Sequence, residues 1–211
     1  MQPQIVDARA GVETGSIAAL VAAAGESARM GRPKALLRWR HEPLVRRLVR
    51  VALAAGASPC VVTVPGAPVD AQIREALRGL EATIVANAAP ALGLIGSVRT
   101  ALDLVGARAL GLALAPVDAP FISTPDFMRL LDAARAPGAI AVPQVGALNG
   151  HPVVFERALF EALRSSLADQ GAARLIEERA GQVVRVPCDD PRLSAHLNTP
   201  EDARALGISL D

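Results

Sequence analysis

The sequence has few of the side chains on which several classes of function depend. Its 211 residues include no tyrosine, and aromatic residues make up only 2% of the chain. Stacking of nucleic-acid bases on an aromatic platform is therefore disfavoured. The net charge is +1, and no basic stripe with interleaved aromatics marks a nucleic-acid surface. We expect no nucleic-acid partner.

Cysteine and histidine are also scarce. The two cysteines, Cys60 and Cys188, and the three scattered histidines lack the spacing of a structural zinc site. Two isolated thiols are typical of a reducing cytoplasm. The apolar run 17–24 is too short to span a membrane, and residues 1–15 lack the features of a secretion signal. We expect a cytoplasmic protein without membrane contact, with a flexible leader (1–15) and a single domain (16–211).

Hydrophobic residues make up 51% of the chain, and they alternate between two patterns. Apolar runs predict strands at 17–22, 60–64, 83–85, 109–115, 140–142, 152–155 and 182–186. Helical periodicity predicts helices at 43–55, 69–77, 97–105, 124–134, 156–167, 171–179 and 200–206. This alternation predicts an α/β fold, Rossmann-like, with a mostly parallel sheet and helices on both faces. Ligands of such sheets bind beyond the carboxyl ends of the strands.

The segment 23–34, after the first expected strand, carries the most information about function. Its first three residues are small and let a ligand approach the backbone, and its glycines permit amide groups to face phosphate oxygens. Arg29 and Lys34 add two cations that suit a polyphosphate. The segment matches neither the Walker A motif nor the dinucleotide fingerprint. The alternative is an ordinary strand–helix turn with surface cations, which accounts less well for Arg29, Gly31, Pro33 and Lys34 together.

Polar residues in later loops are further candidates. Asp118 follows a buried apolar run, where a carboxylate can hold Mg²⁺ against triphosphate oxygens. Its alternative role is a turn or helix cap, which Ser123 or Thr124 can fill instead. Asn198 precedes a Thr-Pro-Glu sequence and can equally begin a helix. His151 follows a polar loop and is either structural or in contact with a substrate.

The motifs together resemble those of nucleotidyltransferases related to molybdenum cofactor cytidylyltransferase and guanylyltransferase. The family signature Leu-Ala-Ala-Gly-x-Ser-x-Arg-Met-Gly-x-Pro-Lys matches residues 22–34, except for Ala22 in place of leucine. The other matching motifs are Asn87 with Gly93-Leu94-Ile95-Gly96-Ser97, Pro116-Val117-Asp118-Ala119-Pro120-Phe121, Gly150-His151-Pro152-Val153-Val154-Phe155 and Asn198-Thr199-Pro200-Glu201-Asp202. These five motifs span roughly residues 17–206 in order.

The resemblance implies a nucleotide-diphospho-sugar transferase type of fold and a Mg²⁺-dependent reaction. The enzyme would transfer CMP from a nucleoside triphosphate to the phosphate of a molybdopterin-type acceptor and release pyrophosphate. GMP is the less favoured alternative to CMP. The residues implied are Arg29, Lys34 and Asp118 as catalytic; Ala23, Ala24, Gly25, Gly31, Asn87, Gly93 and Ser97 as nucleotide-binding; Asp118 and Asn198 as metal-binding; and His151 and Gln144 as substrate-binding. Ser97 could instead simply cap a helix. Molybdenum enzymes or their chaperones are further expected partners.

Two departures from the family pattern bear on this interpretation. Cytidylyltransferase-like sequences usually have Asp-Ile-Asp-Thr-Pro where this chain has His196-Leu197-Asn198, so two carboxylates are lost. The stretch 116–119 also departs from their usual Asp-Gln-Pro. In favour of CTP, Ala23-Ala24-Gly25 resembles the CTP-using branch, and a side chain at Ala24 narrows the base pocket. A sugar-phosphate or alcohol-phosphate nucleotidyltransferase and a non-catalytic nucleotide-binding partner of molybdenum enzymes are the alternatives.

Overall fold

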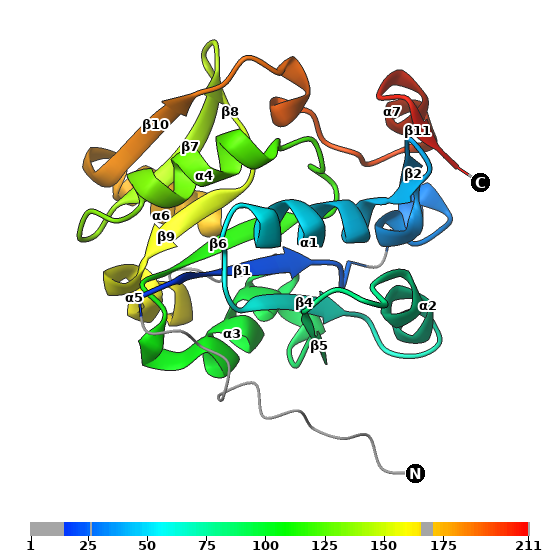
Figure 1. Cartoon of the computed structure of the whole chain (residues 1–211), viewed down its shortest axis with the longest axis horizontal. Helices are drawn as coiled ribbons and strands as arrows, with labels where there is room; N and C mark the ends of the chain where they lie inside the picture. The colour runs from blue at the N-terminus through cyan, green and yellow to red at the C-terminus, as the bar shows by residue number, and fades with distance from the viewer. Residues whose placement is uncertain (1–14, 26, 166–170, 211) are drawn as a thin grey trace.

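The computed structural model describes residues 15–25, 27–165 and 171–210, so the expected leader lies outside the described residues except for Gly15. Its centre is an eight-stranded sheet in the order β10-β7-β9-β6-β1-β4-β5, with β8 paired to β7 (Figure 1). The strands are β1 (Ile17–Ala22), β4 (Cys60–Val64), β5 (Thr83–Ala86), β6 (Gly111–Pro116), β7 (Ile140–Val145), β8 (Leu148–Asn149), β9 (Val153–Glu156) and β10 (Val183–Pro187).

The sheet is mostly parallel, as the sequence predicts. Strand β1 pairs in parallel with both β4 and β6, and the pairs β4–β5 and β7–β10 are parallel too. Strand β9 runs against both of its neighbours, β6 and β7. The chain turns back after β7 through the short antiparallel partner β8, and such a tight connection can only join antiparallel strands.

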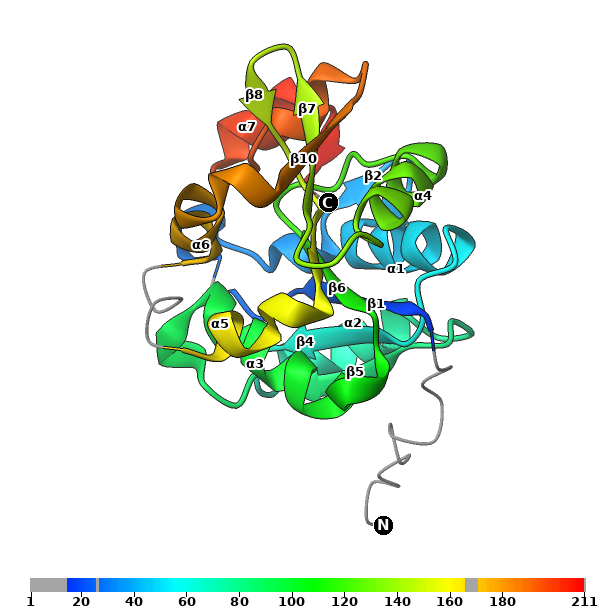
Figure 2. The ribbon, with the colours of Figure 1, turned by 90° about the vertical axis from the view of Figure 1, so that its left-hand side faces the viewer.

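Helices cover both faces of the sheet (Figures 1 and 2). The helices are α1 (Leu44–Ala54), α2 (Val69–Ala76), α3 (Leu94–Val105), α4 (Thr124–Ala133), α5 (Phe160–Arg164), α6 (Ala172–Glu178) and α7 (Pro200–Ala205). Alternate residues of β1 belong to two separate cores, because successive strand side chains point to opposite faces. Ile17, Ala19 and Val21 pack with α1, α2 and α4, whereas Ala18, Leu20 and Ala22 pack with α3, α5 and α6.

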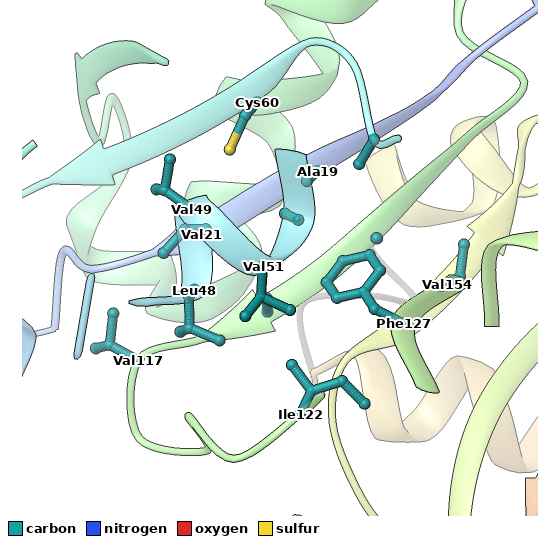
Figure 3. Close-up of a cluster of buried hydrophobic side chains, with 14 of the residues drawn as sticks. Ala19, Val21, Leu48, Val49, Val51, Cys60, Val117, Ile122, Phe127 and Val154 are labelled. Carbon is teal, nitrogen blue, oxygen red and sulfur yellow. The ribbon is translucent and has the colours of Figure 1, made fainter. Parts of the chain in front are cut away.

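The core under α1 and α4 anchors the strands at the centre of the sheet (Figure 3). Leu48 and Val51 of α1 lie against Val21 of β1, and Phe127 of α4 packs into the same cluster with Ile122. Each of these side chains is at most 2% exposed. Burying a side chain of this size contributes about 1.5–3 kcal/mol, so the carboxyl ends of β1 and β6 are held on a rigid support.

A second, three-stranded sheet in the order β11-β2-β3 was not expected from the sequence. Its strands are β2 (Arg38–Trp39), β3 (Glu42–Pro43) and β11 (Ile208–Ser209), and segments of two residues carry no detectable periodicity. A third core cluster, which includes Met30, Leu37 and Leu197, lies beneath it. This small sheet and the cluster beneath it bring β11 and Leu197 next to Met30 and Leu37, which lie in the segment between β1 and β2.

Several helix boundaries differ from the expected ones. Helix α3 begins at Leu94, so Ser97 lies inside the helix and is 2% exposed, and the alternative role of Ser97 as a helix cap is wrong. Gly93 takes the cap position with a φ of 57°, a conformation that favours glycine. The expected helix 156–167 begins later, at Phe160, after a short 3-10 turn, and α5 ends at Arg164.

The cap of α4 also differs. Ser123, rather than Thr124, occupies the cap position, and its Oγ accepts a hydrogen bond of 3.2 Å from the Asp126 amide. Asp118 is therefore not needed as a cap in this region. Among the residues that the structure describes, no helix is long and apolar enough to cross a membrane.

Candidate active site

A cleft of about 500 Å³ opens beyond the carboxyl ends of β1, β5 and β6. Eight of the residues that the sequence singles out line it, namely Ala24, Gly25, Lys34, Asn87, Gly93, Ser97, Asp118 and His151. They come from four separate segments of the chain: the loop after β1, the segment from Asn87 into α3, the turn after β6 and the turn before β9. The position agrees with the general rule that ligands of parallel α/β sheets bind outside the carboxyl ends of the strands.

Lys34 stands at the centre of the polar side of the cleft. It begins a short 3-10 turn directly after Pro33, and its backbone amide donates to Ser27 Oγ at 3.1 Å. Its Nζ donates to Asn198 Oδ1 at 3.0 Å and lies 3.8 Å from the carboxylate of Asp118. The Lys34 side chain is only 14% exposed, so this ammonium faces the cleft and not bulk water.

Asp118 and Asn198 are fixed relative to one another by the backbone. Asp118 follows β6, and its carbonyl oxygen accepts a hydrogen bond of 2.8 Å from the Leu197 amide. Asn198 lies just before α7, where the Asp202 carboxylate accepts from the amides of Asn198 and Thr199 at 2.9 and 2.8 Å. These bonds hold the pKa of Asp202 below its ordinary value. The helix-start interpretation and the site interpretation of Asn198 are thus compatible, because its backbone serves one and its side chain the other.

The oxygen atoms beside Lys34 suit a hard divalent cation. The Asp118 carboxylate and the Asn198 amide oxygen both lie next to the Lys34 ammonium. Asn198 does not line the cleft itself, and its link to the cleft is the hydrogen bond from Lys34. Within the described residues, no group of three or more His, Cys, Asp or Glu side chains is placed to hold a metal. The remaining ligands of a cation here would therefore be phosphate oxygens and water, which is the usual arrangement for Mg²⁺ in nucleotide sites.

His151 and His196 also line the cleft, where their rings meet edge to face with centroids 5.8 Å apart and planes at 76°. Burial lowers the pKa of His151 to about 4, although the nearby Asp118 carboxylate acts in the opposite direction. The imidazole is therefore neutral at pH 7. Its Nδ1 atom is buried without a hydrogen-bond partner among the described residues. An unmatched buried nitrogen costs about 1–3 kcal/mol, which a bound ligand could recover.

A second cleft of about 430 Å³ adjoins the first, because His151 and Leu94 line both. Its walls are mainly apolar and come chiefly from the strands β6, β7 and β9 and from α6. The first cleft thus contains the charged side chains of Lys34 and Asp118, and the second is mainly apolar. Two different molecules bound in them would meet beside His151.

Four more of the residues that the sequence predicts do not line either cleft. Ala23 is buried, and its amide donates to the Thr63 carbonyl at 2.9 Å. Arg29 is exposed on a 3-10 turn, and Gly31 ends that turn with a φ of 72°. Gln144 belongs to β7 and pairs with β8. The proposed roles of these four residues stay predictions.

The cleft also contains residues that sequence reasoning missed. Ser27, Pro90 and Leu94 line it, and each lies within or beside a motif used above. Ser27 belongs to the Ser-x-Arg-Met-Gly pattern itself and could have been found from it. His196 was noted only as a departure from the family pattern, and nothing in its sequence context indicates that its ring faces His151.

Comparison with known proteins gives consistent results. A family model described as "MobA-like NTP transferase domain" matches residues 19–183. A "Probable molybdenum cofactor guanylyltransferase" of Opitutus terrae is 32% identical over 196 residues, covering 89% of this chain and 93% of the relative. These matches agree with the resemblance seen in the sequence motifs.

Solved structures show the same fold. The crystal structure of Rv0371c from Mycobacterium tuberculosis H37Rv has a TM-score of 0.78 and 28% identity, covering 92% of this chain and 99% of that one. A structure of the same protein in complex with manganese has a TM-score of 0.73 at 28% identity, over 90% and 97% of the two chains. The 2-C-methyl-D-erythritol 4-phosphate cytidylyltransferase of Thermus thermophilus, at 20% identity, 91% and 97% coverage and a TM-score of 0.66, shares the fold.

Proposed function

This chain belongs to the family of MobA-like NTP transferase domains and is a nucleotidyltransferase, and from that premise we propose that it transfers CMP from CTP to the phosphate of molybdopterin cofactor. The observation that carries the proposal is the convergence of Lys34, Asp118 and Asn198 at a cleft that adjoins a second, apolar one. The first arrangement suits a triphosphate, and the second suits a flat heterocyclic acceptor.

The chemistry needs positioning more than proton transfer. A phosphate oxygen of the acceptor attacks the α-phosphorus of CTP, and the bond between the α-phosphorus and the bridging oxygen breaks to release pyrophosphate. The acceptor phosphate is largely ionised near neutral pH, so a general base is unnecessary. Lys34 would hold the triphosphate and the departing pyrophosphate, where it stabilises the charge that develops. The neutral His151, between the two clefts, would bond to a substrate and orient it.

Asp118 and Asn198 would hold a divalent cation, which we take to be Mg²⁺. Such an ion neutralises charge on the phosphate oxygens and orients them when it is bound. The manganese complex of the similar mycobacterial protein supports the use of a divalent cation. The segment 196–198 lacks the two carboxylates of the family pattern, and Asp118 is the carboxylate that forms an ion pair with Lys34. Asn198 then contributes a neutral oxygen.

The choice of CTP rests on the cleft beside β1. Ala24 lines the cleft, and its methyl group would narrow a base pocket there, which would favour a pyrimidine over a purine. The names of the curated relatives, including the Opitutus terrae protein, favour GTP as the second candidate. Both nucleotides would use the same polyphosphate contacts, so the base would change only the fit beside Ala24.

The test is pyrophosphate release with Mg²⁺ and each of CTP, GTP, ATP and UTP, with and without molybdenum-loaded molybdopterin. We expect release with CTP only when the acceptor is present. A preference for GTP would keep the mechanism and overturn the base argument. Release with a sugar phosphate or an alcohol phosphate but not with the pterin would overturn the acceptor, and binding of nucleotide without any release would overturn catalysis.

The matched pair of variants for this assay is Asp118→Asn and Asp132→Asn. Asp132 is an exposed acid of α4, paired only with the neighbouring exposed Arg135 in the described structure. Asp118→Asn should lose about 10²–10³-fold in kcat/KM, by analogy with other electrostatic contacts to the transition state. Asp132→Asn should behave as wild type. Equal activity of the two variants would contradict the role given to Asp118.

A further inference from the structure

Trp39 lies where two segments that carry site residues meet. It ends β2 of the small sheet, and its ring packs edge-on against Phe121, with centroids 5.7 Å apart and planes at 87°. Phe121 is buried and follows Asp118 by three positions. The contact places the indole directly behind the loop from which Asp118 reaches into the cleft.

Arg47 ties this loop to Trp39. Its guanidinium stacks over the indole at 4.6 Å from the ring centroid. The same group donates to the carbonyl oxygens of Pro120 and Ile122 at 3.0 and 3.1 Å, which are the residues on either side of Phe121. Arg47 belongs to α1, whose other face packs into the main core. The loop after Asp118 is therefore held from a rigid helix through Trp39 and Arg47 together.

Arg192 ties the second segment to the same ring. Its guanidinium lies 5.2 Å from the Trp39 centroid and 4.8 Å from that of Phe121. The Arg192 guanidinium donates hydrogen bonds of 2.9 and 2.7 Å to the Asp190 carboxylate, which fix its orientation. From Arg192 the chain runs through Leu197 to Asn198, the second oxygen beside Lys34.

The segment between Arg192 and Asn198 also contacts the turn that carries His151. The Leu193 carbonyl accepts from the His151 amide at 3.4 Å. A Cβ at Gly150 would lie only 2.4 Å from the same carbonyl oxygen, so glycine is needed for this approach. A shift of the segment would therefore displace Asn198 and His151 together.

We propose that Trp39, which Arg47 and Arg192 both contact, is a positioning residue that supports the backbone hydrogen bond between Leu197 and Asp118 and so maintains the distance between the side chains of Asp118 and Asn198. The inference rests on the proposed function for its catalytic consequence. Trp39 touches neither cleft and acts only through the two segments. Groups that hydrogen-bond to a metal's ligands typically change metal affinity or activity by about 10–100-fold when they are replaced, and we expect an effect of the same order for Trp39.

Three variants separate positioning from general stability. Trp39→Leu removes the ring that both arginines contact. Trp39→Phe keeps an aromatic face for them and is the conservative rescue. Arg40→Met is the matched control, because exposed Arg40 stacks on the same ring at 4.5 Å but comes from the turn between β2 and β3. All three are compared at a temperature well below the melting point of each variant.

The first readout needs no acceptor. Calorimetry measures the binding of Mn²⁺ to the protein saturated with a CTP analogue that has a non-cleavable bridge between the α- and β-phosphates. Trp39→Leu should weaken Mn²⁺ binding by about 10-fold or more, whereas Trp39→Phe and Arg40→Met should stay close to wild type. Full affinity in a folded Trp39→Leu protein would overturn the proposal.

The second readout is pyrophosphate release with CTP and acceptor. Trp39→Leu should lower kcat by up to about 100-fold with a smaller change in the KM for CTP, since misplacement affects the reacting geometry most. If Trp39→Leu does not fold, Arg192→Met makes the same test by releasing only the segment before Asn198. A wild-type protein that binds Mn²⁺ and the analogue but forms no product would overturn the proposed function while the calorimetric comparison still decides the role of Trp39.

Discussion

Replacing Lys34 with methionine removes the ammonium between Asp118 and Asn198 and keeps most of the side-chain volume. At 3.8 Å, two unit charges interact by about 4 kcal/mol when the effective dielectric constant is about 20. Contacts of the same ammonium with phosphate oxygens would be of similar strength in a water-poor cleft. We expect Lys34→Met to lose about 3–4 kcal/mol of transition-state stabilisation, which is about 10²–10³-fold in kcat/KM.

The stability of this variant should change little. Asp118 is 33% exposed, so water can solvate its carboxylate once the ammonium is gone, and the loss should stay within about 1 kcal/mol. Steady-state pyrophosphate release and a thermal melt measure the two quantities. Arg32→Met is the control, because Arg32 is an exposed cation two positions away that does not line the cleft. A folded Lys34→Met protein with the kcat/KM of this control would refute the reasoning.

Three further predictions concern stability and reactivity. Gly96→Ala should destabilise the fold by about 1–3 kcal/mol in denaturant titrations, because its Cβ would lie 2.0 Å from the Ala89 carbonyl oxygen, whereas Gly66→Ala, in open space, should be close to neutral. Burial raises the pKa of the Cys60 thiol to about 12, so Cys60 should resist a disulfide reagent at pH 8 until the protein is unfolded; rapid labelling of the native protein would contradict this. Burial depresses the pKa of His151 from 6.5 to about 4, so between these values the unfolded chain binds a proton that the folded protein does not. The free energy of unfolding should therefore be highest above pH 6.5 and fall by about 2–3 kcal/mol as the pH drops towards 4. His151→Gln should lose that part of the pH dependence, and an unchanged profile of stability against pH would contradict the assignment to His151.

The central strands of the sheet could be predicted from the sequence because they are buried on both faces. The bounds of β1 and β4 agree with the apolar runs 17–22 and 60–64, since each run is long enough to be distinguished from a turn. The small sheet could not be predicted in the same way. Each of its strands has only two residues, and their pairing depends on the third core cluster and not on a local pattern.

The candidate site could be predicted by residue type more readily than by contact. The motifs indicate that Lys34, Asp118 and Asn198 belong to one site, but Lys34 and Asn198 are 164 positions apart and no spacing rule places them at 3.0 Å. The facing rings of His151 and His196 depend on two backbone segments that meet at Leu193. Both contacts depend on how distant loops pack together, and this packing cannot be read from a single sequence.

Identification of the reaction product tests the central claim most directly. CTP labelled at its α-phosphate would be incubated with the protein, Mg²⁺ and molybdenum-loaded molybdopterin. The products would then be separated and their masses measured by mass spectrometry. The account predicts that the label joins the acceptor as a CMP adduct, with one pyrophosphate released for each adduct formed. Label found only in free CMP or in unreacted CTP, or an acceptor that gains the γ-phosphate instead, would contradict it.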